Sequence, residues 1–357
     1  MIILARYLSR EILGSVFLAI SMLLLLFAFL DLISEIPDIR PPAYTLTKVL
    51  LYILLRVPGH LLELLPVATI VGALFALARL SASSEFTVMR TSGLATRRLV
   101  GYLLLLGTLM GSLIFVLGEY VSPHSDRAAQ QLKVRATTGV IARQFRTGLW
   151  AKDGHNFINI QALQPDGALV NPLIYVFADD LRLQAIREAK RAVWQPDGSW
   201  LLEDVTDTHL SDRGAHIERH VSLPWRTDVN PDLLAVLMIP PDQMSLRTLD
   251  AYIEHLAENR QKTSRYEAAY WNKIAFPLAA PIMLLIALPF AFHAPRSGNV
   301  SGRVLAGILI GLGFHLMNRL SAHLGLLNDW PPALSAFATL GLFTLGALIA
   351  LWRAERI

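Results

Sequence analysis

Six stretches of about 20 mostly apolar residues are the feature that most constrains this chain. They cover residues 12–32, 57–80, 99–121, 271–292, 304–324 and 333–352. A helix needs about 20 apolar residues to cross the hydrocarbon core of a bilayer, and it pairs its backbone polar groups internally. The sequence therefore predicts six membrane helices, three on each side of a polar interval. The prolines of the second and fourth helices are expected to kink them rather than break them: Pro58, Pro66, Pro277, Pro281 and Pro289.

The composition agrees with a polytopic membrane protein. Of the 357 residues, 54% are hydrophobic and only 17% are charged, and the mean hydropathy is +0.45. This balance excludes an ordinary soluble enzyme. The chain has no cysteine, which excludes disulfides, thiolate catalysis and cysteine-based metal sites. The net charge of +4 is small, and in a membrane chain it reports topology rather than nucleic-acid binding.

The basic residues of the short loops predict the orientation. One side of the six-helix arrangement holds Arg6, Arg10, Arg79, Arg90, Arg97, Arg98, Arg296, Arg303, Arg353 and Arg356. The short loops of the other side hold only Arg40, Lys48 and Arg56. By the positive-inside rule both termini are expected in the cytoplasm, and residues 122–270 outside it. Residues 12–32 are long enough to span and precede no A-x-A-like cleavage site, so we expect a retained helix rather than a signal peptide.

The polar interval is typical of a β domain. Segments 146–150, 156–163, 169–177, 183–194, 200–206 and 216–223 are short and contain β-branched or aromatic residues. Pro-Asp-Gly turns at 165–167 and 196–198 separate some of them. This spacing predicts a sandwich, a jellyroll or an open barrel. From 245 to 259 the periodicity becomes helical, with Ser245 as N-cap, and this helix is expected to return the chain to the membrane.

The predicted architecture is therefore an α-helical polytopic membrane protein with an inserted all-β, jellyroll-like domain. Residues 1–121 hold helices one to three, residues 122–270 the β domain and return helix, and residues 271–357 helices four to six. No phosphate-binding loop, H-E-x-x-H or G-x-S-x-G motif occurs. We predict that the chain is not an enzyme and that it holds no catalytic residue, metal or cofactor. Its energy must come from a partner or an ion gradient.

The loop at 81–93, between helices two and three, is the most informative short stretch. Ser83 or Ser84 can cap a helix, and Glu85 suits the positive N-terminal end of that helix. Phe86 and Met89 lie three residues apart on one face, with Arg90 beside them. A short helix with an acidic residue and apolar side chains is a surface that an ATPase groove would grip. An ordinary helical connector is the alternative, and the residues alone favour it.

Three short runs of sequence carry a resemblance to a known family. The first is Ser84-Glu85 with Val88-Met89 and Ser92-Gly93, the second is Gly118-Glu119-Tyr120-Val121 with Pro123, and the third is Gly-Leu-Trp-Ala-Lys-Asp-Gly at 148–154 with Asn156-Phe157. With its three-plus-three helices and inserted domain, nearly the whole chain resembles the LptF/LptG (YjgP/YjgQ) permease family. The Leu-Trp-Ala-Lys-Asp-Gly run favours the LptG side.

This resemblance implies a lipopolysaccharide exporter in the inner membrane of a Gram-negative bacterium. It implies a heterodimer with an LptF-like subunit, driven by two copies of the cytoplasmic ATPase LptB. Lipopolysaccharide would leave the membrane and pass through a periplasmic β-jellyroll towards LptC and LptA. On this basis residues 81–93 are the coupling helix and Glu85 is its acidic contact. The expected coupling residues are Glu85, Phe86, Met89 and Arg90.

Helix five carries a basic stripe that suits such a substrate. His315, Arg319 and His323 are spaced i, i+4 and i+8, and so share one helix face. Ionisable residues inside a membrane are costly and usually face a cavity or a partner. Arginine suits bidentate phosphate binding, so a lipid A phosphate is the candidate ligand and Arg319 is expected to line the gate through which lipid enters. Snorkelling of Arg319 to the headgroups, with His323 simply interfacial, is an equally weighted alternative.

A second basic group, Arg127, Lys133 and Arg135, follows helix three. Family members place basic residues here near the lipid headgroup; Lys133 falls on one such position and Gln130 on the other. The family's lysine-rich patch after helix one is absent, and Asp31, Glu35, Asp38 and Arg40 stand there instead. Either Arg40 and Lys48 substitute for it, or the phosphate contacts have moved to helix five. The expected lipopolysaccharide contacts are Lys133, Arg135, Arg319, His315, His323 and Arg40.

Three weaker signals stay open. Glu63, inside helix two, can pair with Arg56, with His60 or with a basic residue of another helix, but the sequence favours an interfacial carboxylate that reaches water. Gly107-x-x-x-Gly111 and Gly307-x-x-x-Gly311 permit close helix contact, within the chain or at a dimer seam. A set of β-domain side chains can line an acyl slot or form a closed core, which the residues alone favour: Trp150, Phe157, Ile158, Ile160, Tyr175 and Phe177.

Two functions of other classes compete with lipid export. A non-transporting anchor or sensor would bind a protein through its outer domain and signal through residues 81–93. A proton-driven lipid carrier would need a buried acidic relay, for which Glu63 is a thin basis. A transporter subunit should copurify with lipopolysaccharide and stimulate or organise the ATPase, whereas a sensor need do neither.

Overall fold

The computed structural model describes residues 2–39, 41–92, 95–136, 149–163, 167–178, 180, 182–211, 214–227, 229–231, 240–292 and 300–355. Within these residues, six helices are long and apolar enough to cross a membrane. They are Ile3–Asp38, Leu46–Ala82, Thr96–Lys133, Ser264–Phe292, Ser301–Leu327 and Pro332–Ala354. The six predicted membrane helices are therefore confirmed, and each extends beyond its apolar stretch at one end or both.

The first half of the bundle consists of α1 (Ile2–Glu35), the short η1 (Ile36–Asp38), α2 (Leu46–Ala82), α3 (Glu85–Thr91), α4 (Thr96–Val116), a π-helical turn η2 (Leu117–Val121) and α5 (Ser122–Ala136). Helix α2 continues through Pro58 and Pro66, as predicted. The third membrane helix was predicted to end at residue 121, but α5 prolongs it to Ala136. Ala129 and Ala136 of α5 are buried in a cluster with Tyr52 and Ile53 of α2, so tertiary packing supports this polar helix.

The second half consists of α9 (Ser264–Ala275), η4 (Phe276–Leu278), α10 (Ala279–Ala287), α11 (Pro289–Phe292), α12 (Val300–Leu327) and α13 (Pro332–Glu355). The fourth membrane helix is interrupted rather than merely kinked. A 3-10 turn contains Pro277, and α11 starts anew at Pro289. Each proline lacks the N–H that would continue the helical hydrogen bonding, which explains both interruptions.

Glycines bring helices of this one chain into close contact. A Cβ on Gly107 of α4 would lie 2.8 Å from the backbone nitrogen of Pro281 in α10. A Cβ on Gly311 of α12 would lie 3.2 Å from the Cα atom of Val67 in α2. Each of the two Gly-x-x-x-Gly motifs therefore contains a glycine that packs against another helix of the same chain. This was one of the two alternatives that the sequence left open, the other being a dimer seam.

The inserted segment forms one antiparallel sheet of eight strands, which confirms the predicted all-β domain. The strands are β1 (Leu149–Asp153), β2 (Asn156–Ile160), β3 (Ala162–Leu163), β4 (Leu169–Val170), β5 (Leu173–Phe177), β6 (Leu183–Trp194), β7 (Trp200–Ser211) and β8 (Gly214–Trp225). Strand β6 pairs with β4 and β5 along one edge and with β7 along the other, and β8 pairs with β7. The turn at 196–198 joins β6 to β7, whereas residues 165–166 of the other predicted turn lie outside the described residues.

Alternation along the strands divides the aromatic and aliphatic residues of this sheet. Ile158 and Ile160 are buried in a core with Trp200 and Leu202. Trp150 and Phe157 are 50% and 39% exposed. Both lie on the face opposite Ile158, because Phe157 precedes Ile158 in β2 and Trp150 pairs with Asn159, which follows it. The expectation that these aromatic residues share a closed core with Ile158 and Ile160 is therefore wrong for Trp150 and Phe157. Trp150 instead stacks on Tyr175 at 5.8 Å between ring centroids, and Phe157 meets Phe177 edge-on at 5.7 Å.

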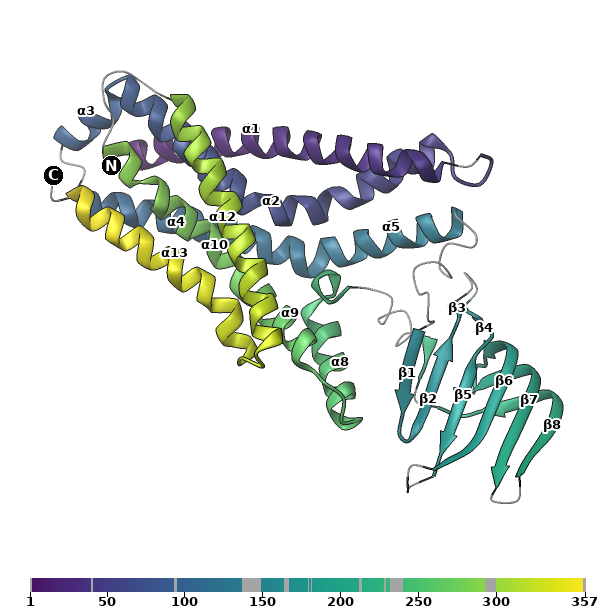
Figure 1. Ribbon diagram of the computed structural model, residues 1–357. Coiled ribbons are helices and arrows are strands. Elements are labelled where there is room, and N and C mark those ends of the chain that lie inside the picture. The colour runs from purple at the N-terminus through teal and green to yellow at the C-terminus, as the bar shows by residue number, and fades with distance from the viewer. Residues whose placement is uncertain are drawn as a thin grey trace.

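After the sheet, η3 (Pro241–Gln243) and α8 (Leu246–Glu258) lead back to the bundle. Ser245 caps α8 by accepting a hydrogen bond from the Thr248 backbone N–H, so the predicted N-cap and return helix are confirmed. The β1–β2 turn rests on the end of this helix, where the Gly154 N–H donates to Asn259 Oδ1 at 3.3 Å. Figure 1 shows the β domain beyond one end of the helix bundle, with α3 and both chain termini at the opposite end.

Candidate functional site

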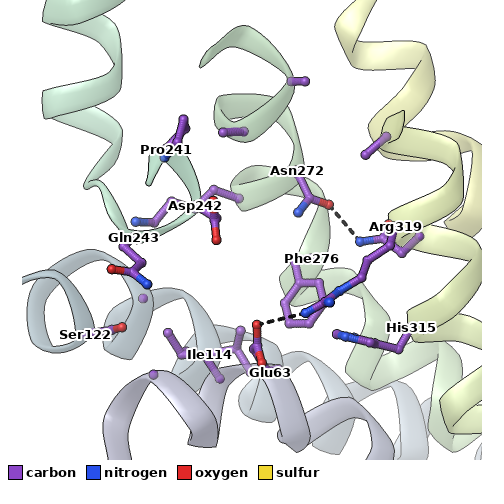
Figure 2. Close-up of a pocket in the computed structure, with 18 of the residues that line it drawn as sticks. Glu63, Ile114, Ser122, Pro241, Asp242, Gln243, Asn272, Phe276, His315 and Arg319 are labelled. Carbon is purple, nitrogen blue, oxygen red and sulfur yellow. Dashed lines mark hydrogen bonds and ion pairs between the residues drawn. The ribbon is translucent and has the colours of Figure 1, made fainter. Parts of the chain in front are cut away.

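A pocket of about 570 Å³ opens among α2, α9 and α12, towards the end of the bundle that carries the β domain. Figure 2 shows η3 and α5 beside it, and the side chains of Glu63, Asn272, His315 and Arg319 turned towards one another. Its ionisable lining residues are Arg56, His60, Glu63, Asp126, Asp242, Arg265, Lys273, His315, Arg319 and His323. Ionisable groups in membrane segments are costly, so this concentration makes the pocket the candidate functional site.

Arg319 of α12 reaches across the pocket to Glu63 of α2. The Arg319 Nη2 atom lies 3.6 Å from Glu63 Oε1, and the two side chains are 67% and 50% exposed. Among the described residues, Glu63 is the acidic partner with which Arg319 forms an ion pair. A guanidinium has five N–H donors, so a single carboxylate contact leaves donors for an anionic ligand. Glu63 thus pairs with a basic residue of another helix, one of the alternatives that the sequence left open.

The predicted basic stripe of helix five lines this pocket as a unit. His315, Arg319 and His323 are all lining residues. Between them, Asn318 donates a hydrogen bond from Nδ2 to Asn272 Oδ1 of α9 at 3.0 Å (Figure 2). This bond fixes α12 against α9 and so sets the distance between the stripe and the opposite wall. Arg319 therefore faces a cavity and an acidic partner.

The wall formed by η2 and α9 contains a lysine and a glutamate that sequence reasoning did not select. Glu119 accepts a hydrogen bond from the Leu246 backbone N–H at 2.8 Å, at the start of α8. Its carboxylate lies 3.8 Å from the Lys273 Nζ atom, which also donates to the Met244 carbonyl. A carboxylate at a helix N-terminus is favoured by the helix dipole. Glu119 therefore connects the third membrane helix, α8 and α9 at one point; its only signal in the sequence was its place in a family motif.

A second wall joins α1, α2 and α5. Asp31 lies 2.7 Å from the His60 Nε2 atom and 4.0 Å from the Arg56 Nη1 atom. On α5, Ser122 donates to Asp126 at 2.8 Å. In the sequence, Asp31 was noted because an acid stands where a lysine was expected. The structure gives Asp31 a structural partner on α2 instead.

Lys133 is held by acidic residues at the end of α1 and does not line the pocket. Its Nζ atom lies 2.7 Å from Glu35 Oε1 and 3.2 Å from Asp38 Oδ2. The ammonium also lies 5.4 Å above the Tyr52 ring. Tyr44 donates to the other oxygen of Glu35 at 3.1 Å, and burial, with the charge of Glu35, raises the pKa of that tyrosine. The charge of Lys133 is thus already balanced inside the protein.

Three other predicted residues have no described side chain. Arg40 falls outside the described residues, and the side chains of Arg90 in α3 and Arg135 in α5 also lie outside what the structure describes. Their predicted roles stay predictions. For the residues that are described, no group of three or more His, Asp or Glu side chains is arranged to hold a metal ion.

Helix α3 lies at the other end of the bundle and is packed tightly onto it. Phe86 and Met89 are buried, and the Phe86 ring meets Phe292 of α11 at 5.7 Å between centroids. Glu85 accepts hydrogen bonds from Tyr7 of α1 at 2.7 Å and from Ser83 at 2.9 Å. The Tyr7 hydrogen bond is the main cause that lowers the pKa of Glu85. The outward apolar side chain of α3 is Val88, which is 61% exposed.

Comparison of the sequence with known proteins shows which proteins this chain resembles. The family described as "Lipopolysaccharide export system permease LptF/LptG" matches residues 6–353. The chain is 30% identical to the lipopolysaccharide export system permease protein LptG of Escherichia coli K12, over 99% of this chain and 98% of that protein. It is 27% identical to LptG of Haemophilus influenzae, over 97% and 96% of the two chains. LptF of Escherichia coli K12 is 26% identical over 90% and 87%.

Proposed function

The chain belongs to the family of lipopolysaccharide export system permeases LptF/LptG, and on that basis we propose that it extracts lipopolysaccharide from the inner membrane of a Gram-negative bacterium. It acts as the LptG-like permease subunit and hydrolyses no ATP itself. The observation that carries the substrate assignment is the ionisable pocket beside Arg319. A lipid whose headgroup bears phosphates needs cations at membrane depth, and α12 supplies one beside a cavity.

The Arg319 guanidinium is the proposed contact for a lipid A phosphate. Arginine binds phosphate through two parallel N–H···O bonds, and these are stronger than bonds between neutral groups. Glu63 approaches one side of the guanidinium, with its Oε1 atom 3.6 Å from Arg319 Nη2. An arriving phosphate competes with this carboxylate, while His315 and His323 line the same space. Glu63 therefore balances the positive charge of Arg319 until a substrate phosphate takes its place.

The proposed orientation has both termini in the cytoplasm and residues 122–270 in the periplasm. The basic residues of the short loops support it. Both termini lie at the same end of the bundle as α3, and the β domain lies at the other end (Figure 1). The proposed partners are an LptF-like subunit, an LptB-like ATPase dimer that contacts α3, and an LptC/LptA-like periplasmic bridge next to the β domain.

The burial pattern assigns different tasks to the predicted coupling residues. Phe86 and Met89 anchor α3 to the bundle, because they pack on its interior. Val88 and the Glu85 carboxylate are the proposed contacts for the ATPase, and Arg90 stays with them as a predicted contact. In the β domain, the apolar inner face around Ile158, Ile160 and Leu202 is the proposed path for acyl chains.

The proposed function is tested by reconstitution. The complex with its LptF-like and LptB-like partners is placed in vesicles that contain lipopolysaccharide, and release to an added periplasmic acceptor is measured with and without ATP. Release that requires ATP is the expected result. The Arg319→Ala variant should release less lipopolysaccharide by about tenfold, which is the scale of one lost hydrogen bond to a charged group. Arg319→Lys keeps the positive charge but loses the paired N–H donors of the guanidinium. Its release of lipopolysaccharide should therefore lie between that of wild type and that of Arg319→Ala.

The same experiment separates export from the rival functions. A non-transporting sensor would neither copurify with lipopolysaccharide nor release it, whatever residue stands at 319. A proton-driven carrier would release lipid without ATP when a pH gradient is imposed. Release that is equal for wild type and Arg319→Ala would reduce this arginine to an interfacial residue and would remove the substrate site from the pocket.

A further inference from the structure

Glu85, the acidic residue of α3, is held inside the chain through both of its carboxylate oxygens. The Tyr7 hydroxyl donates to Oε2 at 2.7 Å, and the Ser83 hydroxyl donates to Oε1 at 2.9 Å. Ser83 is a local neighbour, only two residues away. Tyr7 is 78 residues away, near the start of α1. The tyrosine therefore decides where this carboxylate stands relative to the first membrane helix.

Helix α3 is also attached to two other membrane helices. Its buried Phe86 packs on Phe292 of α11. Just before α3, the Ser81 hydroxyl donates to the Ala291 carbonyl of α11 at 3.2 Å. Arg79 at the end of α2 forms an ion pair with Glu11 of α1. Phe86 carries the contact of α3 with α11, and Ser81 and Arg79 tie the end of α2, just before α3, to α11 and α1. Among the described residues, Tyr7 is the hydrogen-bonding link between α3 and α1.

We propose that Tyr7 is a positioning residue that aims the Glu85 carboxylate at a cationic side chain of the ATPase and transmits movement of α3 to α1. The inference rests on the proposed function, because it needs α3 to be the ATPase contact. A carboxylate offers about four lone-pair sites, so Glu85 can accept from Tyr7 and Ser83 and still receive a guanidinium or ammonium of a partner. Tyr7 thus orients the Glu85 carboxylate and still leaves lone pairs on it for the partner's cation.

The physical role of the hydroxyl is to reduce the freedom of a long side chain. A free glutamate at the start of a short helix samples many rotamers, and ordering it on binding costs free energy. One donor from α1 and one from the turn between α2 and α3 hold it in one direction before the partner arrives. Because one of them belongs to α1, a pull on the carboxylate is also a pull on that helix. Loss of the hydroxyl leaves α3 folded, since Phe86 and Met89 remain buried.

The test compares Tyr7→Phe with wild type in the assembled complex. This variant removes one oxygen and keeps the ring. The expected result is normal assembly, with lipopolysaccharide released per ATP hydrolysed reduced about threefold to tenfold, the scale of one lost hydrogen bond. Tyr120→Phe is the matched control, since Tyr120 lies in η2 and its side chain is 66% exposed. Tyr120→Phe should leave the amount of lipopolysaccharide released per ATP hydrolysed unchanged.

A double-mutant cycle gives the second readout. In a Glu85→Gln background, Tyr7→Phe should add little to the defect, because both changes act on one contact. Additive defects would overturn the proposal, and so would an unchanged ratio for Tyr7→Phe. Movement is measured directly with spin labels at cysteines introduced at positions 5 and 87, since the chain has no cysteine of its own and Thr87 of α3 is exposed. On ATP addition their distance should stay constant in wild type and change in Tyr7→Phe.

Val88→Asp separates a failure of this inference from a failure of its premise. This variant alters the outward face of α3 and leaves its buried residues in place. If Val88→Asp blocks ATPase association while Tyr7→Phe behaves as wild type, α3 is the ATPase contact and the role of Tyr7 is refuted. If Val88→Asp assembles and transports normally, the ATPase contact lies elsewhere, and the role of Tyr7 falls with it.

Discussion

Lys133 carries a positive charge that the protein itself already uses. Glu35 and Asp38 approach its ammonium from the end of α1, and the Tyr44 hydroxyl donates a hydrogen bond to the other oxygen of Glu35. Glu35 is only 5% exposed, so its charge depends on this lysine. Burying a carboxylate without a partner costs more free energy than the pair contributes. We therefore propose that Lys133 fastens α5 to α1, and its role as a headgroup contact stays a prediction.

This assignment predicts how Lys133 variants behave. Lys133→Met leaves Glu35 buried without its cation and should destabilise the protein by roughly 1–3 kcal/mol, which a lower melting temperature in detergent would report. Lys133→Glu should be worse, because it brings a third carboxylate to the same place. Both variants should impair export through loss of structure.

The double variant Lys133→Met with Glu35→Gln tests the cause. Removal of both charges should restore most of the melting temperature and most of the export, since no buried charge is left unpaired. The carboxylate of Asp38 remains, but its side chain is 45% exposed and reaches water. A double variant that is stable but still fails to export would return Lys133 to the role of a substrate contact.

At this scale the sequence predicted residue types better than residue partners. The spacing of His315, Arg319 and His323 was sufficient to place them on one face, because helical periodicity is local. The pairing of Arg319 with Glu63 was not predictable, since it joins helices 256 residues apart in the chain. Lys133 resembled a free cation because Glu35 and Asp38, its neutralising partners, are distant in sequence.

Close contact between α4 and α10 depends on the absence of a side chain at one position. A Cβ at Gly107 would lie 2.8 Å from the Pro281 nitrogen, and backbone on that side cannot move as a side chain can. Gly101, two turns earlier on the same helix, has no atom within 4 Å of its Cβ position. These two glycines are a matched pair for testing whether the contact is structural.

Gly107→Val should separate α4 from α10 and destabilise the chain by roughly 1–3 kcal/mol, the usual scale of overpacking. Gly101→Val should have little effect on the melting temperature. Measurement of both variants without the partner subunit is decisive, because an effect of Gly107→Val seen only in the assembled complex would move this contact from the interior of the chain to the dimer seam.

At the element scale, hydropathy found the membrane helices and missed their extensions. Helix α5 is polar, and no apolar run marked it; it is helical because Ala129 and Ala136 pack against α2. The β strands followed from alternation, yet the assignment of faces did not. Trp150 and Phe157 have the hydrophobicity of core residues, but their parity relative to Ile158 directs them outward. The alternation of Phe157 with Ile158 was available in the sequence. The face of Trp150 depends on how β1 pairs with β2, and the identity of the buried face came from the fold.

The whole molecule consists of a helix bundle with a charged pocket near one end, and with α3, the proposed ATPase contact, at the other. Arg319 and Glu63 belong to the pocket, and Glu85 with Tyr7 belongs to α3. The long helices α1 and α2 connect the two ends. The family resemblance predicted this plan from three short runs of sequence. The pocket itself is assembled from helices α2, α9 and α12, and no local pattern could indicate it.

The central claim is that lipopolysaccharide occupies the pocket beside Arg319 while the complex works. Site-specific photocrosslinking from position 319 in cells tests it most directly, with position 342 as a control, because Leu342 of α13 is 54% exposed and lines no part of this pocket. The account predicts a lipopolysaccharide crosslink at 319 that depends on an active ATPase partner, and none at 342. Equal crosslinking at both positions, or none at 319 while export continues, would contradict it.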